Sequence, residues 1–156
     1  MKSNKVLFIV LILFGFVLTG KLYSQDNWWK EKKYRSEEKR QKFLNCKNVF
    51  INIGEGLNYA NVYALTPYFG TDVYLNILDN EKGYYSYEQT RLIIDNFLTN
   101  NAVYEFSWRI SSRSENYAFA SGKYKYKRNG YLNSYDFSVS LKYINGGWLI
   151  DQIIIN

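Results

Sequence analysis

The stretch that decides the fold runs from Tyr117 to Arg128 and reads YAFASGKYKYKR. Small and aromatic residues alternate in it with mostly polar or basic residues, which is the period-two pattern of a strand buried on one face. Asn129 and Gly130 follow directly, and an Asn-Gly pair is a strong signal for a hairpin turn. The face predicted to point inward carries Ala118, Ala120, Gly122, Tyr124 and Tyr126.

Three more strands are predicted around this one. In the strand before it, Tyr104, Phe106, Trp108 and Ile110 are expected to share one face. In the strand after it, Phe137, Val139, Leu141 and Tyr143 alternate with polar residues. Residues 145–147 read NGG and predict a second turn, and the segment 148–155 is apolar on nearly both faces, as in a covered central strand. Short turns between four such strands predict an antiparallel meander.

Helical patterns precede these strands. The apolar spacing over residues 46–59 is helical, and Asn61 is placed to cap a second, short helix that ends at Leu65. Residues 71–78 alternate like a strand, and residues 79–83 are expected to form a loop. Ser86 and Gln89 form a capping-box pattern that begins a helix ending near Asn100. Helices followed by a run of strands predict an α+β fold, with helices packed on the concave face of a curved, mainly antiparallel sheet.

The order of these elements, together with two sequence stretches near the strand ends, resembles a known family. The stretches are ASGKY at residues 120–124 and GWLIDQI at residues 147–153, and SYEQTRLIIDNFLTNN at residues 86–101 matches the family's middle helix. The family is a group of uncharacterised exported proteins of Bacteroidetes, classed as a domain of unknown function. The resemblance covers roughly residues 46–156. It implies a cone-shaped nuclear-transport-factor-two-like (cystatin-like, SnoaL-like) fold and no particular activity.

The N-terminus predicts export. Lys2 and Lys5 precede an apolar run over residues 6–18, and a polar stretch ends at Ser24. This order is typical of a secretory signal peptide, and the run is short for a membrane span. We predict cleavage between Ser24 and Gln25 and a periplasmic or secreted protein; an uncleaved anchor helix is the alternative. The expected division is a signal peptide (1–24), a charged leader (25–45) and one α+β domain (46–156).

The charge of the chain lies at its N-terminal end. Residues 25–48 contain eight Lys or Arg and four Asp or Glu, whereas residues 49–156 contain nine basic and ten acidic residues. A domain that is nearly neutral is a poor nucleic-acid binder, so we predict no such partner. The leader, residues 26–44, is expected to be a solvated helix or partly ordered. Its Trp28 and Trp29 dock on the domain, stay exposed or rest at a membrane surface, and membrane contact is expected only through the signal peptide or leader.

Several chemistries are excluded by composition. The chain has no histidine, which rules out Ser-His-Asp and Cys-His catalysis and imidazole-based zinc sites. Cys46 is the only cysteine, so no internal disulfide can form, and we interpret it as a small apolar residue. We predict no cofactor and no metal. Among the aspartates, Asp151 stands out between apolar neighbours as a hydrogen-bonded carboxylate or a general base.

Tyrosine is abundant, with 16 residues in the chain. Ordinary sheet packing explains this, and an aromatic-lined cavity with hydroxyls for a polar ligand is the alternative. The candidate pocket-lining residues are Tyr104, Phe106, Trp108, Tyr124, Tyr126, Phe137 and Asp151. Lys123, Lys125, Lys127 and Arg128 form a basic ladder, interpreted as a solvated face or a contact for an anionic partner.

Three functional hypotheses follow. The first is an exported, non-catalytic binding or protein-interaction module of the bacterial envelope, whose partner is a small ligand or an envelope protein; dimerisation through the outer sheet face is part of this hypothesis. The second is a small lyase, isomerase or hydrolase that uses Asp and Tyr without histidine or metal. The third is an envelope adaptor that docks through Trp28 and Trp29.

Overall fold

The computed structural model describes residues 26–156. The predicted signal peptide and its cleavage site lie outside these residues. Within them, no helix is both long enough and apolar enough to cross a bilayer.

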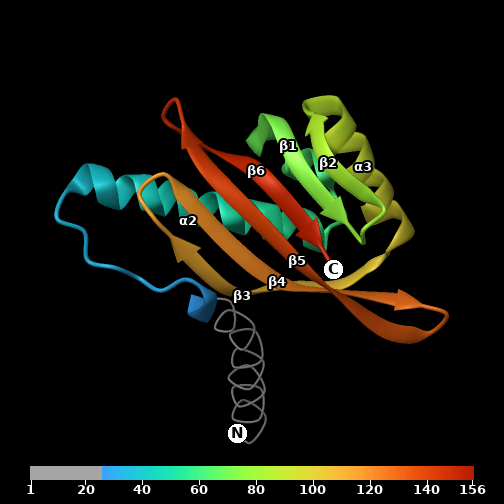
Figure 1. Cartoon of the computed structure of the whole chain (residues 1–156). Helices are drawn as coiled ribbons and strands as arrows, with labels where there is room; N and C mark the ends of the chain where they lie inside the picture. Colours follow the sequence, from blue (N-terminus) through green and yellow to red (C-terminus); the bar gives the residue numbers. More distant parts are fainter. Residues whose placement is uncertain (1–25) are drawn as a thin grey trace, which may run out of the picture.

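A six-stranded sheet forms the centre of the fold (Figure 1), in the order β2-β1-β6-β5-β4-β3. β1 and β6 are parallel, and every other neighbouring pair is antiparallel. The strands are β1 (Phe69–Ile77), β2 (Glu81–Ser86), β3 (Val103–Arg113), β4 (Tyr117–Arg128), β5 (Tyr131–Ile144) and β6 (Gly147–Ile155). The helices are η1 (Asp26–Trp28), α2 (Glu37–Asn58), η2 (Val62–Ala64), η3 (Thr66–Tyr68) and α3 (Tyr87–Asn100). The predicted α+β class is confirmed.

The predicted meander is confirmed in β3 to β6. Asn129 and Gly130 both adopt positive φ angles, 52° and 81°, as the hairpin turn between β4 and β5 requires. Five alternate residues of β4, from Ala118 to Tyr126, are buried as predicted. Their regular alternation shows that the period-two pattern set the orientation of this strand.

The helix α2 begins earlier than predicted. It starts at Glu37 instead of Cys46, because the Ser36 hydroxyl accepts a hydrogen bond from the Lys39 N–H at 3.2 Å and Glu38 also lies in the first turn. The helix continues without a break through residues 45 and 46. The predicted division between leader and domain therefore falls inside one continuous element.

The segment expected to be a loop includes the first residues of the strand β2. Residues 79–83 include Asp79 and Gly83, which favour a turn, yet β2 pairs antiparallel with β1, with Val73 opposite Tyr85. The turn is made instead by Leu78 and Asp79, both at positive φ, 52° and 57°. Leucine rarely adopts this conformation, so the local sequence gives no turn signal at that position.

Two irregularities in β3 change which side chains share a face. The pairing with β4 shifts by one residue between Val103 and Glu105, and again between Trp108 and Ile110. A bulge of this kind moves the following residues to the other face of the sheet. Tyr104 and Ile110, predicted to lie beside Phe106 and Trp108, are instead 58% and 59% exposed.

The helices pack on the sheet at different strands. α2 contacts β3 and β6, whereas α3 contacts β1 and β2. α3 begins as predicted, with the Gln89 side-chain oxygen accepting hydrogen bonds from the backbone N–H and the hydroxyl of Ser86, both at 3.1 Å. The predicted cap of the short helix is also confirmed, since the Asn61 side chain accepts from the Tyr63 N–H. The core lies between this helical layer and the sheet.

Candidate functional site

The predicted cavity residues form part of the packed core. Phe106, Trp108, Tyr124, Tyr126 and Phe137 are each at most 7% exposed. The Phe106 ring lies 4.7 Å from that of Trp108 and 5.8 Å from that of Phe137, in edge-to-face contacts between centroids. Side chains packed in this way fill the inward face of the meander rather than line an open cavity.

The other two candidates lie elsewhere. Tyr104 is the extra residue of the first β3 bulge, and its ring lies 4.8 Å from the Lys127 ammonium. Asp151 is the extra residue where the β5–β6 pairing shifts, and it is half-buried beside a shallow surface hollow lined also by Tyr117 and Phe119. Among residues 27–156, neither of the buried tyrosines, Tyr124 and Tyr126, has a hydrogen bond to a carboxylate.

Tyr124 is held as a structural hydrogen-bond donor. Its hydroxyl donates to the Asn101 carbonyl oxygen at 2.7 Å, and burial raises the pKa of Tyr124 to about 12. A phenol with this pKa stays protonated at neutral pH, so it cannot serve as a general base there.

The leader closes the interior. The Trp28 ring lies 6.0 Å from the rings of both Phe50 and Trp108, and the Ser111 hydroxyl donates to the Trp28 carbonyl oxygen at 2.6 Å. Both Trp28 and Trp29 are buried. The alternatives for this pair were docking on the domain, exposure, or contact with a membrane surface. In the structure both rings dock on the domain.

Arg113 fastens the segment that follows. We call residues Lys30–Arg35, between Trp29 and the Ser36 cap, the strap. The Arg113 guanidinium donates to the Lys30 carbonyl oxygen at 2.8 Å and to the Tyr34 hydroxyl at 2.7 Å. It also lies 4.2 Å from the Trp29 ring centroid, a cation–π contact. Arg113 reaches the strap because the second β3 bulge turns it to the inner side.

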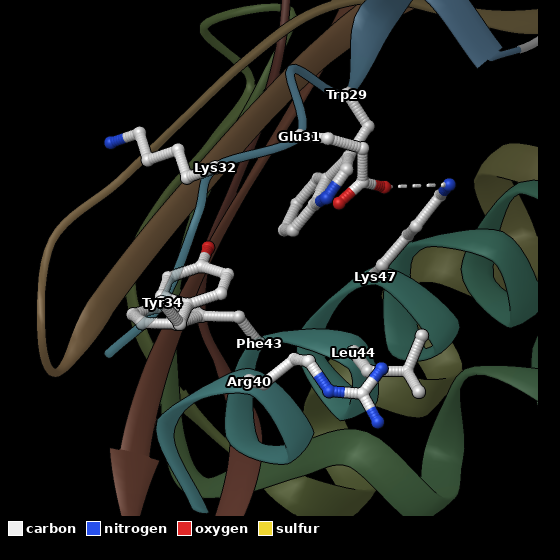
Figure 2. A pocket seen from close by; sticks show the side chains of 8 residues that line it. All are labelled: Trp29, Glu31, Lys32, Tyr34, Arg40, Phe43, Leu44 and Lys47. Atoms are coloured by element: carbon white, nitrogen blue, oxygen red, sulfur yellow. Dashed lines mark hydrogen bonds and ion pairs between the residues drawn. The ribbon is translucent and has the colours of Figure 1, made fainter. Parts of the chain in front are cut away.

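A hollow lies between the strap and the first half of α2 (Figure 2). Its volume is about 140 Å³, close to that of a cavity that accepts a benzene ring. Tyr34 stacks on Phe43 at 5.0 Å between centroids, with the planes 17° apart. The lining residues are Trp29, Glu31, Lys32, Tyr34, Arg40, Phe43, Leu44 and Lys47. The walls are aromatic, and the rim carries three cations together with the Glu31 carboxylate.

Ion pairs neutralise part of the charge around the hollow. Lys47 and Glu31 meet across its mouth at 3.3 Å, as the dashed line in Figure 2 shows. Arg40 donates two hydrogen bonds to Glu37, at 2.6 and 2.8 Å, and these lower the pKa of Glu37. Among residues 26–156, the cations of the strap form no such pairs.

Two of the four cations in the basic ladder on β4 are neutralised by ion pairs. The Lys123 ammonium lies 2.7 Å from the Asp136 carboxylate, and the Lys125 ammonium 2.6 Å from that of Glu105. Cross-strand pairs of this kind stabilise the sheet and reduce the field available to an anionic partner. The ladder is thus a weaker anionic contact than its sequence indicated.

Cys46 lies in the core on α2. Burial raises the pKa of its thiol to about 12, against the opposing field of Arg113. The thiol stays protonated at neutral pH and is a poor nucleophile. This agrees with the prediction of a small apolar residue.

Sequence reasoning did not identify Arg113, Tyr34 and Phe43 as members of one site. Arg113 lies 70 or more positions away from Tyr34 and Phe43, and Tyr34 lies in a segment without apolar periodicity. No spacing rule in the sequence therefore joins the three residues. The adjacent Trp28 and Trp29 were the available signal, because two tryptophans in a charged segment need a surface that covers them.

Replacing Arg113 with Ala should release the strap. We expect the free energy of unfolding to fall by about 2 kcal/mol, because two hydrogen bonds from a charged donor and a cation–π contact are lost. Trypsin should then cleave faster within residues 30–35, which contain four Lys or Arg residues. Denaturant titration and timed proteolysis measure the two effects.

Arg109→Ala is the matched control, because Arg109 is exposed on the same strand and its side chain has no polar partner among residues 26–156. We expect a change below about 0.5 kcal/mol. Equal cleavage of the two variants would contradict the fastening role of Arg113.

The comparisons with known proteins identify a family. The profile of the domain of unknown function DUF4783 matches residues 50–156. No curated protein matches the chain. Among the described residues, no group of three or more potential metal ligands lies together.

Solved structures have the same fold. A DUF4783 family protein from Bacteroides ovatus is 18% identical, with a TM-score of 0.61 over 67% of this chain and 90% of the other. One from Bacteroides uniformis is 17% identical, with a TM-score of 0.62 over 68% and 94%. An NTF2-like protein of unknown function from Cytophaga hutchinsonii is 15% identical, with a TM-score of 0.53 over 69% and 95%. The chain therefore belongs to the DUF4783 family and has the nuclear-transport-factor-two-like fold that its sequence resembled.

Proposed function

We propose that this protein is an exported, non-catalytic binding module of the bacterial cell envelope that works through its surface. The observation that carries the proposal is the packed interior. Tyr124, Phe106 and Phe137 are each at most 1% exposed, and Trp28 of the leader packs over Trp108 from the other side. An interior filled by its own aromatic side chains leaves the outer surfaces to make contacts with other molecules.

The distribution of titratable groups supports a non-catalytic role. The chain has no histidine, and no aspartate is among the buried residues of 27–156. Tyr124, the most deeply buried tyrosine, has its hydroxyl engaged by Asn101 and its pKa raised to about 12. An enzyme that uses Asp and Tyr needs the two groups within hydrogen-bond reach of one substrate, directly or through one water. Asp151 instead lies on a half-exposed bulge, and among the described residues no hydrogen bond joins it to Tyr117, which lines the same open hollow.

The surface around the strap is the favoured contact region. It combines a hollow with aromatic walls, a rim of cations and an apolar side chain, Leu44, that is 42% exposed. Arg113 and the two tryptophans hold this region in one conformation, and a preorganised surface loses less entropy when a partner binds.

Genetic rescue tests the proposal. A strain that lacks the protein is complemented with Tyr124→Phe, with Asp151→Asn or with Lys30, Lys32, Lys33 and Arg35 all changed to Gln, and competitive growth is measured against wild type. We expect the first two variants to restore growth and the strap variant to fail, at equal amounts of protein in the envelope fraction.

Loss of rescue by Asp151→Asn, or by Tyr124→Phe at normal protein level, would overturn the proposal. Either result would favour the Asp–Tyr enzyme, and turnover assays would follow.

A further inference from the structure

The strap carries four cations without acidic partners. Lys30, Lys32, Lys33 and Arg35 are exposed, and among residues 26–156 none of them forms an ion pair or a side-chain hydrogen bond. Four such charges within six residues are a concentrated positive surface. The β4 ladder has the same number of cations, but Asp136 and Glu105 neutralise two of them.

The strap is held in place through its backbone and Tyr34. Its backbone is held by Arg113 through the Lys30 carbonyl, and its Tyr34 ring stacks on Phe43. Figure 2 shows Lys32 extending away from the hollow and from α2. The contacts that hold the strap therefore involve its backbone and Tyr34, and they leave its four exposed cations without pairs that would reduce their charge.

Exposed apolar residues accompany the strap. Arg40, Leu44, Lys47 and Ile51 recur at helical spacing on one face of α2, and the first three line the hollow together with Lys32. Leu44 is 42% and Ile51 36% exposed. Arg40 and Lys47 on this face are paired with Glu37 and Glu31, so the positive charge comes from the strap and the exposed apolar side chains come from α2. This combination is typical of a surface that lies at a lipid interface, where both kinds of side chain find a partner.

We infer that the strap and this face of α2 bind the surface of a bilayer that contains anionic phospholipid. The charge asymmetry supports a planar anionic partner, since residues 25–48 carry a net charge of +4 and residues 49–156 a net charge of −1. The inference rests on the proposed binding function and names its partner. The phosphate groups contact the strap cations, and Leu44 and Ile51 enter the headgroup region.

Vesicle sedimentation tests this inference. The protein recovered from the envelope of expressing cells is mixed with vesicles of phosphatidylcholine alone, or with 30% phosphatidylglycerol added, at about 0.1 M salt. We expect binding only with the anionic lipid, and a loss of about 1,000-fold in affinity when all four strap cations become Gln. Binding should weaken as salt is raised.

The β4 ladder provides the matched control. A variant in which all four ladder residues are changed to Gln removes the same number of charges from another surface; these residues are Lys123, Lys125, Lys127 and Arg128. We expect its affinity for the anionic vesicles to fall less than threefold. Changing Lys30, Lys32 and Lys33 to Arg keeps the charge and should keep the binding. Leu44→Gln with Ile51→Gln should weaken binding several-fold while leaving the fold intact.

Equal losses for the strap and ladder variants would overturn the inference, because they would reflect net charge alone. Binding to a soluble sulfated polysaccharide without binding to vesicles would also overturn it. The protein could fail to bind vesicles while Asp151→Asn still rescues growth and the strap variant does not. That result would support the proposed binding function and contradict the lipid partner. If Asp151→Asn abolishes rescue, the proposed function falls whatever the vesicles show.

Discussion

Trp108→Ala is expected to lower the free energy of unfolding by about 4 kcal/mol, in the upper range for truncating a buried aromatic side chain. The Trp108 ring is buried against Phe50, Phe106 and Trp28, at 4.7 to 6.0 Å between centroids. Its ring N–H donates to the Phe50 carbonyl oxygen of α2 at 2.9 Å. Truncation to Ala therefore removes contacts to the sheet, to the helix α2 and to the leader at the same time. Equilibrium denaturation in urea measures the loss.

Ile110→Ala is the control, because the sequence pattern places Ile110 on the same face as Trp108. The bulge between them leaves Ile110 59% exposed, so we expect a change below about 0.5 kcal/mol. Comparable losses for the two variants would mean that the bulge does not form. A small loss for Trp108→Ala would mean that the interior is loosely packed and open to a ligand.

Gly122→Ala is expected to cost about 3 kcal/mol through overpacking. A Cβ atom at this position would collide with the Ser107 carbonyl oxygen of β3 and lie 2.9 Å from the far end of the Phe106 ring. The backbone of β3 cannot withdraw without breaking its pairing with β4. The small residue is therefore needed for close packing, and not for an open space in front of the strand.

Gly147→Ala is the control for this second variant. Its nearest neighbour would be the Ile144 carbonyl oxygen at 3.9 Å, an ordinary contact distance. We expect it to be as stable as wild type or up to about 1 kcal/mol more stable, because glycine is the most flexible residue in the unfolded chain. If Gly122→Ala were equally well tolerated, the inward face of β4 would have unfilled space after all.

Signals carried by neighbouring residues predicted most of the fold. The strand β4, its turn at Asn129 and the helix begun by Ser86 each depend on contacts within a few positions, and all three were confirmed. The strand β2 was missed because its order comes from pairing with β1, through a turn that contains Leu78 in place of glycine. The candidate site was missed almost entirely, since Arg113 meets Tyr34 across 79 positions of sequence.

The sequence alone therefore determined the class of the fold, the main elements of the meander and the exclusion of histidine chemistry. Strand periodicity, helix caps and turn residues each depend on residues that are close together in the sequence. The absence of histidine is known from the composition alone. Tertiary structure decided which side chains share a face and what fills the interior. A one-residue bulge turned Ile110 outward and Arg113 inward, and two leader tryptophans closed the space that the alternation pattern had left for a cavity. Such outcomes depend on the balance of packing contacts between segments distant in the chain, and no local pattern records that balance.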